Sequence, residues 1–277
     1  MSAAPPPLAG VIGWPVGHSR SPALHGHWLR RYGLPGAYVA LAVRPEALEA
    51  ALRGMAALGF AGGNVTLPHK ERALALADAV TPRARRIGAA NTLIVRDGAL
   101  EADNTDGFGF IENLRQNAPD WRADAGPALV LGAGGAARAV VAALLDAGAP
   151  EVRLANRTRD RAEALAQALG GPVTVLDWAQ AAAAADGAAT LVNTTSLGMT
   201  GQPPLELSLD AAPPGALATD IVYAPLETPF LRRAAARGLR TVDGLGMLLH
   251  QARPGFEAWF GAAPEVDDAL RRAVLAA

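Results

Sequence analysis

Short apolar runs alternate with longer amphipathic stretches along most of the chain. Apolar runs with few polar interruptions predict buried strands, for example at 8–12, 128–131 and 216–222. Stretches with apolar residues three and four positions apart predict helices, for example at 45–58 and 159–169. Strands that alternate with helices indicate an α/β fold, in which helices cover a mainly parallel sheet.

One segment predicts a strand, a tight turn and a helix in immediate succession. The apolar run 128–131 is followed by Gly132, Ala133, Gly134, Gly135 and Ala136, and then by an alanine-rich helical pattern. Glycine lets the backbone bend sharply and approach a phosphate, and the N–H groups of the new helix attract the anion. The spacing of Gly132, Gly134 and Ala137 fits the Gly-x-Gly-x-x-Gly/Ala pattern of dinucleotide-binding turns. The alternative is a glycine-rich turn that binds no ligand.

The next predicted strand, 151–154, leads into Asn156, Arg157 and Thr158, with Arg161 close behind. NAD sites usually carry an acidic residue at this position, which binds the ribose 2′-hydroxyl. Arginine instead pairs with a 2′-phosphate and stacks on adenine, and Thr158 suits the start of a helix. These residues predict NADP(H) rather than NAD. The alternative is a solvated arginine cluster at a helix start.

Composition and charge narrow the classes of function. A chain of 277 residues suffices for one large or two medium domains, and a net charge of −1 argues against nucleic-acid binding. The absence of cysteine excludes cysteine-ligated metals, and the five histidines lack metal-ligand spacing, so we expect no metal site. Without a secretory signal or an apolar run of about 18 residues, we expect a cytoplasmic location.

Three short polar segments in the first 106 residues carry candidate chemistry. Pro22 favours an extended Ser21, so that Ser19 and Ser21 can present two hydroxyls to one carboxylate. Lys70 falls in the first turn of a predicted helix, where the helix dipole disfavours a cation, and such a placement is typical of functional sites. Asp106 is a candidate catalytic carboxylate at a predicted domain junction. The alternatives are a helix-capping Ser21, a solvated Lys70 and a helix-capping Asp106.

Seven motifs, in order along residues 10–259, resemble the shikimate dehydrogenase family. They lie at 17–22, 64–70, 90–92, 103–107, 132–138, 156–158 and 243–247. The resemblance implies reversible NADPH-dependent reduction of 3-dehydroshikimate to shikimate, on the route to chorismate and the aromatic amino acids. It implies an α/β fold with two domains: a substrate domain of residues 1–106 plus 245–277, and a Rossmann-like NADP domain of residues 107–244. The C-terminal helices would return to the substrate domain.

The resemblance also implies roles for individual residues. Lys70 would be the acid/base catalyst, with Asp106 as its partner. The substrate would be bound by Ser19, Ser21, Thr66, Asn91, Tyr223 and Gln251. The NADP site would comprise Gly132, Ala133, Gly134, Gly135, Ala136, Asn156, Arg157, Thr158 and Arg161, with Ile221 and Gly244 beside the nicotinamide. We expect a small-molecule substrate, a monomer or homodimer, and no nucleic-acid or membrane partner.

Two features depart from the family pattern. Pro82 stands where the family often has an acidic residue, and the pair Pro254-Gly255 predicts a break or kink in the C-terminal helix. Two other functions are considered. One is a quinate/shikimate dehydrogenase that uses NAD, which the missing acidic residue after the second strand disfavours. The other is a non-catalytic NADP- or shikimate-sensing module, which the presence of both Lys70 and Asp106 disfavours.

Overall fold

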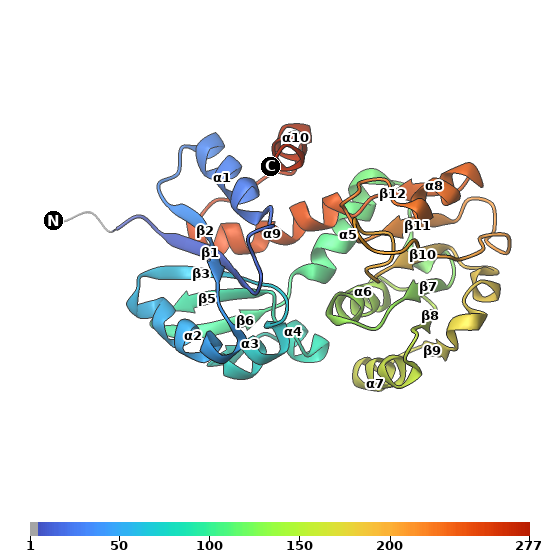
Figure 1. Ribbon diagram of the computed structural model, residues 1–277, viewed down its shortest axis with the longest axis horizontal. Coiled ribbons are helices and arrows are strands. Elements are labelled where there is room, and N and C mark those ends of the chain that lie inside the picture. The colour runs from blue at the N-terminus through green and yellow to red at the C-terminus, as the bar shows by residue number, and fades with distance from the viewer. Residues whose placement is uncertain (1–4) are drawn as a thin grey trace. The chain divides into compact units, whose positions relative to one another are not determined.

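The computed structural model describes residues 5–277 and divides the chain into two compact units. Unit 1 comprises the chain up to Thr105 together with Gln251–Ala277, and unit 2 comprises Asp106–His250. Each unit contains one six-stranded sheet (Figure 1). The expected return to the first domain is at residue 245, whereas the return to unit 1 in the structure begins at Gln251, inside helix α9 (Leu245–Phe260).

The sheet of unit 1 has the strand order β2-β1-β3-β5-β6-β4. Its strands are β1 (Leu8–Gly13), β2 (Ala37–Ala42), β3 (Phe60–Val65), β4 (Ala79–Val80), β5 (Thr92–Arg96) and β6 (Ala99–Asp103). Strand β1 pairs in parallel with β2 and β3, whereas β5 is antiparallel to both β3 and β6. Between β5 and β6, Asp97 and Gly98 have φ values of 51° and 80°, as a two-residue hairpin turn requires.

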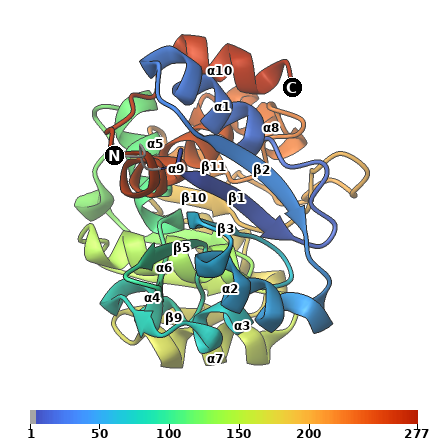
Figure 2. The same cartoon turned by 90° about the vertical axis from the view of Figure 1, so that its left-hand side faces the viewer.

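Helices cover both faces of this sheet (Figure 2). One face carries α1 (Ser21–Tyr32), α10 (Asp268–Leu275) and the second half of α9, and the other carries α2 (Leu48–Ala57) and α3 (Lys70–Leu76). The shorter elements are η1 (Pro45–Ala47) and α4 (Pro82–Ile87). Aromatic rings fill the first face, where the ring centroids of Trp28 and Phe256 lie 5.1 Å apart. Aliphatic side chains fill the second, including Leu48, Leu52 and Leu93.

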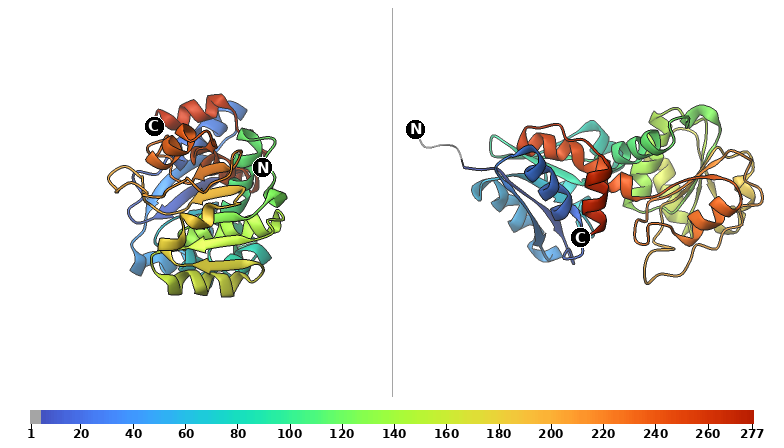
Figure 3. Two further views of the ribbon diagram at one scale, coloured as in Figure 1. Left: turned by 90° about the vertical axis from the view of Figure 1, so that its right-hand side faces the viewer. Right: turned by 90° about the horizontal axis from the view of Figure 1, so that it is seen from above.

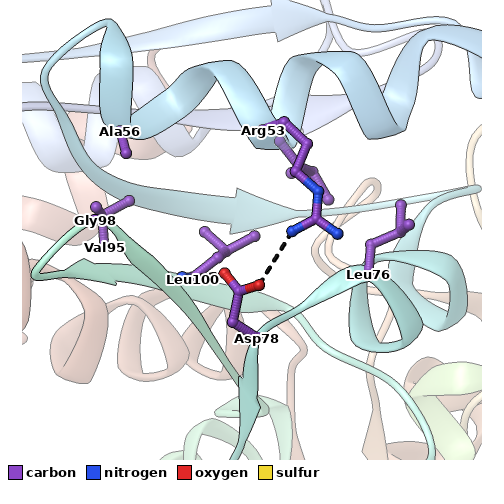
Figure 4. A pocket seen from close by; sticks show the side chains of 8 residues that line it. Arg53, Ala56, Leu76, Asp78, Val95, Gly98 and Leu100 are labelled. Atoms are coloured by element: carbon purple, nitrogen blue, oxygen red, sulfur yellow. Dashed lines mark hydrogen bonds and ion pairs between the residues drawn. The ribbon is translucent and has the colours of Figure 1, made fainter.

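A small pocket lies on the α2 side of unit 1. Arg53 and Asp78 form an ion pair of 3.0 Å beside Leu76, Val95 and Leu100, which also line the pocket (Figure 4). The backbone N–H of Leu100 and the Arg53 guanidinium together lower the pKa of Asp78. None of the candidate site residues lines this pocket, so we regard it as a packing feature.

The sheet of unit 2 has the order β12-β11-β10-β7-β8-β9, with every pair parallel (Figure 3, left). Its strands are β7 (Ala128–Leu131), β8 (Val152–Ala155), β9 (Val173–Leu176), β10 (Thr190–Asn193), β11 (Leu217–Asp220) and β12 (Arg240–Val242). Counted from β7, this is the order 3-2-1-4-5-6 of dinucleotide-binding sheets. In such sheets the ligand binds at the carboxyl ends of the strands, where the order reverses beside the first strand.

The helices of unit 2 are α5 (Asp106–Asn117), α6 (Gly135–Asp146), α7 (Arg159–Leu169) and α8 (Pro229–Ala236), with short turns η2 (Ala123–Ala125), η3 (Trp178–Gln180) and η4 (Ala183–Ala185). Helix α5 packs on α6, α7 packs on β8 and β9, and α8 packs on β11 and β12. Phe230 and Leu231 of α8 join Leu129, Leu131 and Leu191 of the sheet in one apolar core.

Helix α9 continues through Pro254, so the prediction of a break at Pro254-Gly255 is wrong, whereas a kink there stays a prediction. Proline lacks an N–H and removes one helical hydrogen bond. Tertiary contacts of the following turn hold the helix together. The indole N–H of Trp259 donates to the Leu93 carbonyl at 2.9 Å, and the buried Phe256 ring packs against Trp28. Packing of this kind outweighs local helix propensity.

Within residues 5–277, no helix is both long enough and apolar enough to cross a membrane. Over the same residues, no three histidine, cysteine or acidic side chains come together in an arrangement that could hold a metal ion.

Candidate functional site

Five candidate residues of unit 1 gather at one end of its sheet. Ser19 and Ser21 follow β1, and Thr66 and Lys70 follow β3. Because β1 and β3 are parallel neighbours, both segments leave the sheet at the same end. Asn91 directly precedes β5, which runs antiparallel to β3 and therefore begins at that end. The topology thus brings hydroxyl, amide and ammonium groups together.

A buried hydrogen-bond network connects Asn91 with Gln251 of α9. The Asn91 side-chain N–H donates to Gln251 Oε1 at 3.1 Å, and the backbone N–H of Thr105 donates to Asn91 Oδ1 at 2.8 Å. Asn64 Nδ2 donates to the Asn91 carbonyl at 3.1 Å, and the Tyr38 hydroxyl donates to Asn64 Oδ1 at 2.7 Å. Buried polar groups with fixed partners have fixed orientations. Sequence reasoning assigned no role to Tyr38, Asn64 or Thr105.

Ser21 begins helix α1, so the predicted extended conformation is wrong. Proline is tolerated at the next position because the first N–H groups of a helix have no intrahelical acceptor. The Ser19 hydroxyl oxygen accepts the backbone N–H of Ser21 at 3.3 Å, which keeps the two serines close together. Both hydroxyls therefore lie at a helix start, where an anion is favoured.

Lys70 is the first residue of α3, in agreement with the sequence analysis. Its carbonyl accepts the backbone N–H of Ala90 at 2.9 Å, which connects the helix start to the segment before β5. The neighbouring His69 ring donates through Nε2 to the Val43 carbonyl at 2.8 Å, since a carbonyl can only accept. Lys70 is the only lysine in the sequence, and all other residues of the Lys+Arg total of 25 are arginine.

His25 lies on α1, one helical turn after Ser21, and is completely buried. Its ring stacks on Tyr38 with a centroid separation of 3.9 Å and an interplanar angle of 10°. Burial lowers the pKa of His25 to about 3, and the neighbouring Asn64 side chain offsets only part of this shift. Burial also raises the pKa of Tyr38 above its ordinary range. Both rings are therefore neutral at neutral pH.

In unit 2, the glycine turn lies at the carboxyl end of β7. Gly132 has a φ of 111°, and a Cβ there would lie 2.6 Å from Thr194 Oγ1, so only glycine fits. Gly134 is the N-cap residue of α6, which begins at Gly135. A Cβ on either of these two glycines would meet no atom within 4 Å. The residues present therefore leave room for a pyrophosphate beside the N–H groups of the helix start.

The turn after β8 is held by Asn156, whose side-chain N–H donates to the Thr158 carbonyl at 2.7 Å. Thr158 precedes α7, but its side chain makes no capping hydrogen bond, so the capping role considered for it is not seen. The Thr158 carbonyl also accepts the backbone N–H of Arg161 at 3.2 Å.

The arginines of α7 and of the turn before it differ in their partners. Arg159 is held by Glu163 and Asp177, each at 2.7 Å. Arg157 and Arg161 are exposed, and neither pairs with a carboxylate within the part of the chain that the structure describes. Their guanidinium groups are therefore available to an anionic ligand such as a 2′-phosphate.

Ile221, Tyr223 and Gly244 lie just beyond the carboxyl ends of β11 and β12. A Cβ on Gly244 would lie 2.5 Å from the carbonyl carbon and oxygen of Ile221, so the two backbones are in close contact. Asp106 is the first residue of α5 and is buried within unit 2, whereas Lys70 belongs to unit 1. The pairing of Lys70 with Asp106 stays a prediction.

Family models match three segments of the chain. The shikimate dehydrogenase substrate binding domain matches residues 11–93, and the shikimate/quinate 5-dehydrogenase model matches residues 115–197. The shikimate 5′-dehydrogenase C-terminal domain matches residues 244–275. Together these models cover more than half of the chain.

Individual relatives match over nearly the whole length. A shikimate dehydrogenase (NADP(+)) from Rhodospirillum rubrum is 69% identical over 273 residues, which cover 97% of this chain and 96% of the relative. The structure of shikimate 5-dehydrogenase from Thermus thermophilus in complex with NADP(H) and shikimate is 43% identical, with a TM-score of 0.86 and coverage of 96% and 99%. Quinate dehydrogenase from Corynebacterium glutamicum in complex with NAD is 29% identical, with a TM-score of 0.91 and coverage of 99% and 100%. The chain therefore belongs to the shikimate dehydrogenase family.

Proposed function

We propose that the protein catalyses the reversible NADPH-dependent reduction of 3-dehydroshikimate to shikimate. Lys70 carries this proposal, because the only lysine of the chain lies where hydroxyl and amide groups gather in unit 1. The other basic side chain, arginine, stays protonated in proteins, so lysine is the one of the two that can exchange a proton. Relatives that are 69% and 66% identical are named shikimate dehydrogenase (NADP(+)), which supports the same activity.

Unit 1 binds the substrate in this proposal. The hydroxyls of Ser19 and Ser21 donate to the carboxylate of shikimate, at the helix start that favours an anion. Thr66, Asn91 and Gln251 bind the ring hydroxyls. The hydrogen-bond network around Asn91 holds its amide in place before the substrate arrives, and pre-organisation of this kind strengthens binding. Tyr223 adds a further contact to the substrate.

Reduction of the ketone requires a hydride on carbon and a proton on oxygen. When NADPH is bound, it supplies the hydride. The Lys70 ammonium donates the proton to the carbonyl oxygen, and its neutral amine accepts that proton in the reverse reaction. Asp106 is the partner that orients Lys70 and accepts a hydrogen bond from the reacting hydroxyl.

Unit 2 binds the cofactor in this proposal. The N–H groups from Gly132 to Ala136 face the pyrophosphate, in the open space beside Gly134 and Gly135. Asn156, Arg157, Thr158 and Arg161 bind the adenosine ribose and its 2′-phosphate. Ile221 and Gly244 line the nicotinamide.

An assay of nicotinamide absorbance tests the function directly. We expect shikimate to drive rapid reduction of NADP⁺ and much slower reduction of NAD⁺. Activity only with quinate or NAD⁺ would contradict the substrate and cofactor assignments. Folded protein that binds NADP⁺ but shows no turnover would support the sensing module instead.

The remaining expectations concern the surroundings of the enzyme. A net charge of −1 supports the absence of a nucleic-acid partner. A cytoplasmic location fits an enzyme of biosynthesis, and we expect a monomer or a homodimer. Sedimentation of the purified protein distinguishes these two states.

A further inference from the structure

Asp220, the last residue of β11, is a completely buried carboxylate whose hydrogen-bond donors are all neutral. Asn193 Nδ2 donates to both carboxylate oxygens at 3.0 Å, the Val222 backbone N–H donates at 2.9 Å, and the Thr228 hydroxyl donates at 2.8 Å. Burial raises the pKa of Asp220, although these donors offset part of the shift. No cation pairs with it within residues 5–277. A buried charge without a neighbouring cation lowers the stability of the fold, and residues that are kept at such a cost are typical of functional sites.

The three donors come from three segments at the carboxyl edge of the sheet of unit 2. Asn193 ends β10 and lies directly opposite Asp220 in the parallel register of β10 and β11. Val222 belongs to the segment 221–223 that leaves β11. Thr228 is the N-cap residue of α8. One carboxylate therefore fixes two neighbouring strand ends and the start of the following helix.

The hydrogen bonds of Asn193 continue this network toward the glycine turn. Its Oδ1 accepts the backbone N–H of Thr195 at 3.0 Å and the Thr195 hydroxyl at 2.7 Å. The adjacent Thr194 hydroxyl donates to the Leu131 carbonyl at 2.6 Å, immediately before Gly132. The Asn193–Asp220 pair thus joins the ends of β10 and β11, and the adjacent Thr194 joins the end of β10 to that of β7.

We propose that Asp220 is a positioning residue for hydride transfer, because it fixes the backbone of 221–223 at the nicotinamide end of the cofactor site. This proposal rests on the proposed function, which assigns Ile221 and Gly244 to the nicotinamide. On one side, the Asp220 carboxylate holds the Val222 N–H. On the other, Gly244 packs so closely that a Cβ there would lie 2.5 Å from the Ile221 carbonyl. Asp220 acts through Val222 and Asn193 and is not itself a catalytic residue.

The variant Asp220→Asn tests this proposal, because it preserves size and removes one acceptor. Its amide N–H₂ must face at least one of the donors from Asn193, Val222 or Thr228, which displaces that segment. A misplacement of about 1 Å at a reacting centre lowers rates by about 100-fold, so we expect kcat to fall by about 10- to 100-fold. The primary deuterium isotope effect, with shikimate labelled at the oxidised carbon, should rise because hydride transfer becomes slower than product release.

Binding of adenosine 2′,5′-bisphosphate separates positioning from general stability, since this probe carries the 2′-phosphate but no nicotinamide. We expect its Kd to be the same in Asp220→Asn and in the original protein. A parallel loss of probe binding and turnover would show that Asp220 only stabilises unit 2, and this outcome would overturn the proposal. An unchanged kcat and isotope effect would overturn it as well.

Two further variants complete the experiment. Asp210→Asn changes an exposed carboxylate of the same unit and should leave kcat and the isotope effect unchanged. Asn193→Ala removes the central donor and leaves Val222 and Thr228 in place, so it provides the same test if Asp220→Asn does not fold. Failure of the proposed function is seen separately, as absence of shikimate turnover in the unaltered protein.

Discussion

Asn91 and Gln251, which are 160 residues apart in the sequence, are joined by a hydrogen bond of 3.1 Å from Asn91 Nδ2 to Gln251 Oε1. Thr105 binds both residues, since its N–H donates to Asn91 Oδ1 and its hydroxyl donates to the Gln251 carbonyl, each at 2.8 Å. The C-terminal part of the chain thus completes the polar end of the sheet of unit 1. Two proposed ligands of the ring hydroxyls orient each other.

The variant Gln251→Ala should raise the KM for shikimate by about tenfold and change kcat less. It removes one direct hydrogen bond and one restraint on the Asn91 amide, and a loss of about 1.4 kcal/mol corresponds to a tenfold change. Steady-state kinetics at saturating NADP⁺ provide the measurement. Gln202→Ala, at an exposed position of unit 2, is the control. An unchanged KM would remove Gln251 from the substrate site.

The variants Lys70→Ala and Lys70→Arg should both lower kcat by about 100-fold or more, because general acid–base catalysis contributes on this scale. Arginine keeps the charge but cannot exchange the proton. The Kd for shikimate, measured by calorimetry, should change much less in both variants. Arg72→Ala, which removes an exposed cation of the same helix, should retain full activity. Near-normal turnover in either Lys70 variant would exclude Lys70 as the acid/base.

The variant Arg157→Ala should lower kcat/KM for NADP⁺ by about 10- to 100-fold, since hydrogen bonds to charged groups contribute about 1.5–3 kcal/mol. The value for NAD⁺ should hardly change, because NAD⁺ has no 2′-phosphate. Arg159→Ala is the matched control, because Glu163 and Asp177 already hold that guanidinium. Equal losses with both cofactors would show that Arg157 acts elsewhere than on the 2′-phosphate.

Protonation of His25 should make the protein less stable below pH 6.5. The pKa of His25 is about 3 in the folded protein and about 6.5 when the chain is unfolded, so only the unfolded chain takes up a proton as the pH falls from 6.5 toward 3. Each pH unit in this window is equivalent to about 1.4 kcal/mol, so we expect a loss of about 2 kcal/mol between pH 7 and pH 5.

Urea unfolding at pH 7 and pH 5 measures this effect. His25→Phe retains an aromatic ring beside Tyr38 and should show a smaller loss between the two pH values than the unaltered protein. His18→Phe, at an exposed position, should show the full loss. Identical pH dependence in His25→Phe and the unaltered protein would contradict the assignment.

Helices and strands that are specified by a short stretch of neighbouring residues could be predicted from the sequence. Strand β7 and helix α7 have the predicted bounds, 128–131 and 159–169, because a local apolar pattern and flanking residues specify each. The placement of Lys70 in the first turn of α3 follows in the same way. The presence of only one lysine is a further signal in the sequence, which the motifs by themselves do not carry. A single lysine in a chain rich in arginine points to lysine chemistry at that position.

Features that depend on distant segments could not be predicted locally. The rule that proline interrupts a helix gave the wrong result at Pro254, because Trp28 and Leu93 provide contacts for the next turn that no window around Pro254 contains. The contact of Asn193 with Asp220 likewise requires that β10 and β11 pair in one register. Polar residues at strand ends are visible in the sequence, but their partners are decided by strand order.

The division of the chain has a consequence for the order of folding during synthesis. Unit 2 is one continuous stretch, so all of its residues have been made when the ribosome adds His250. Unit 1 cannot complete its packing at that stage, because Trp28 packs on Phe256 and the Leu93 carbonyl accepts a hydrogen bond from Trp259. Residues 5–105 leave the ribosome before residues 251–277. Their aromatic face therefore stays uncovered until residues 251–277 have been synthesised.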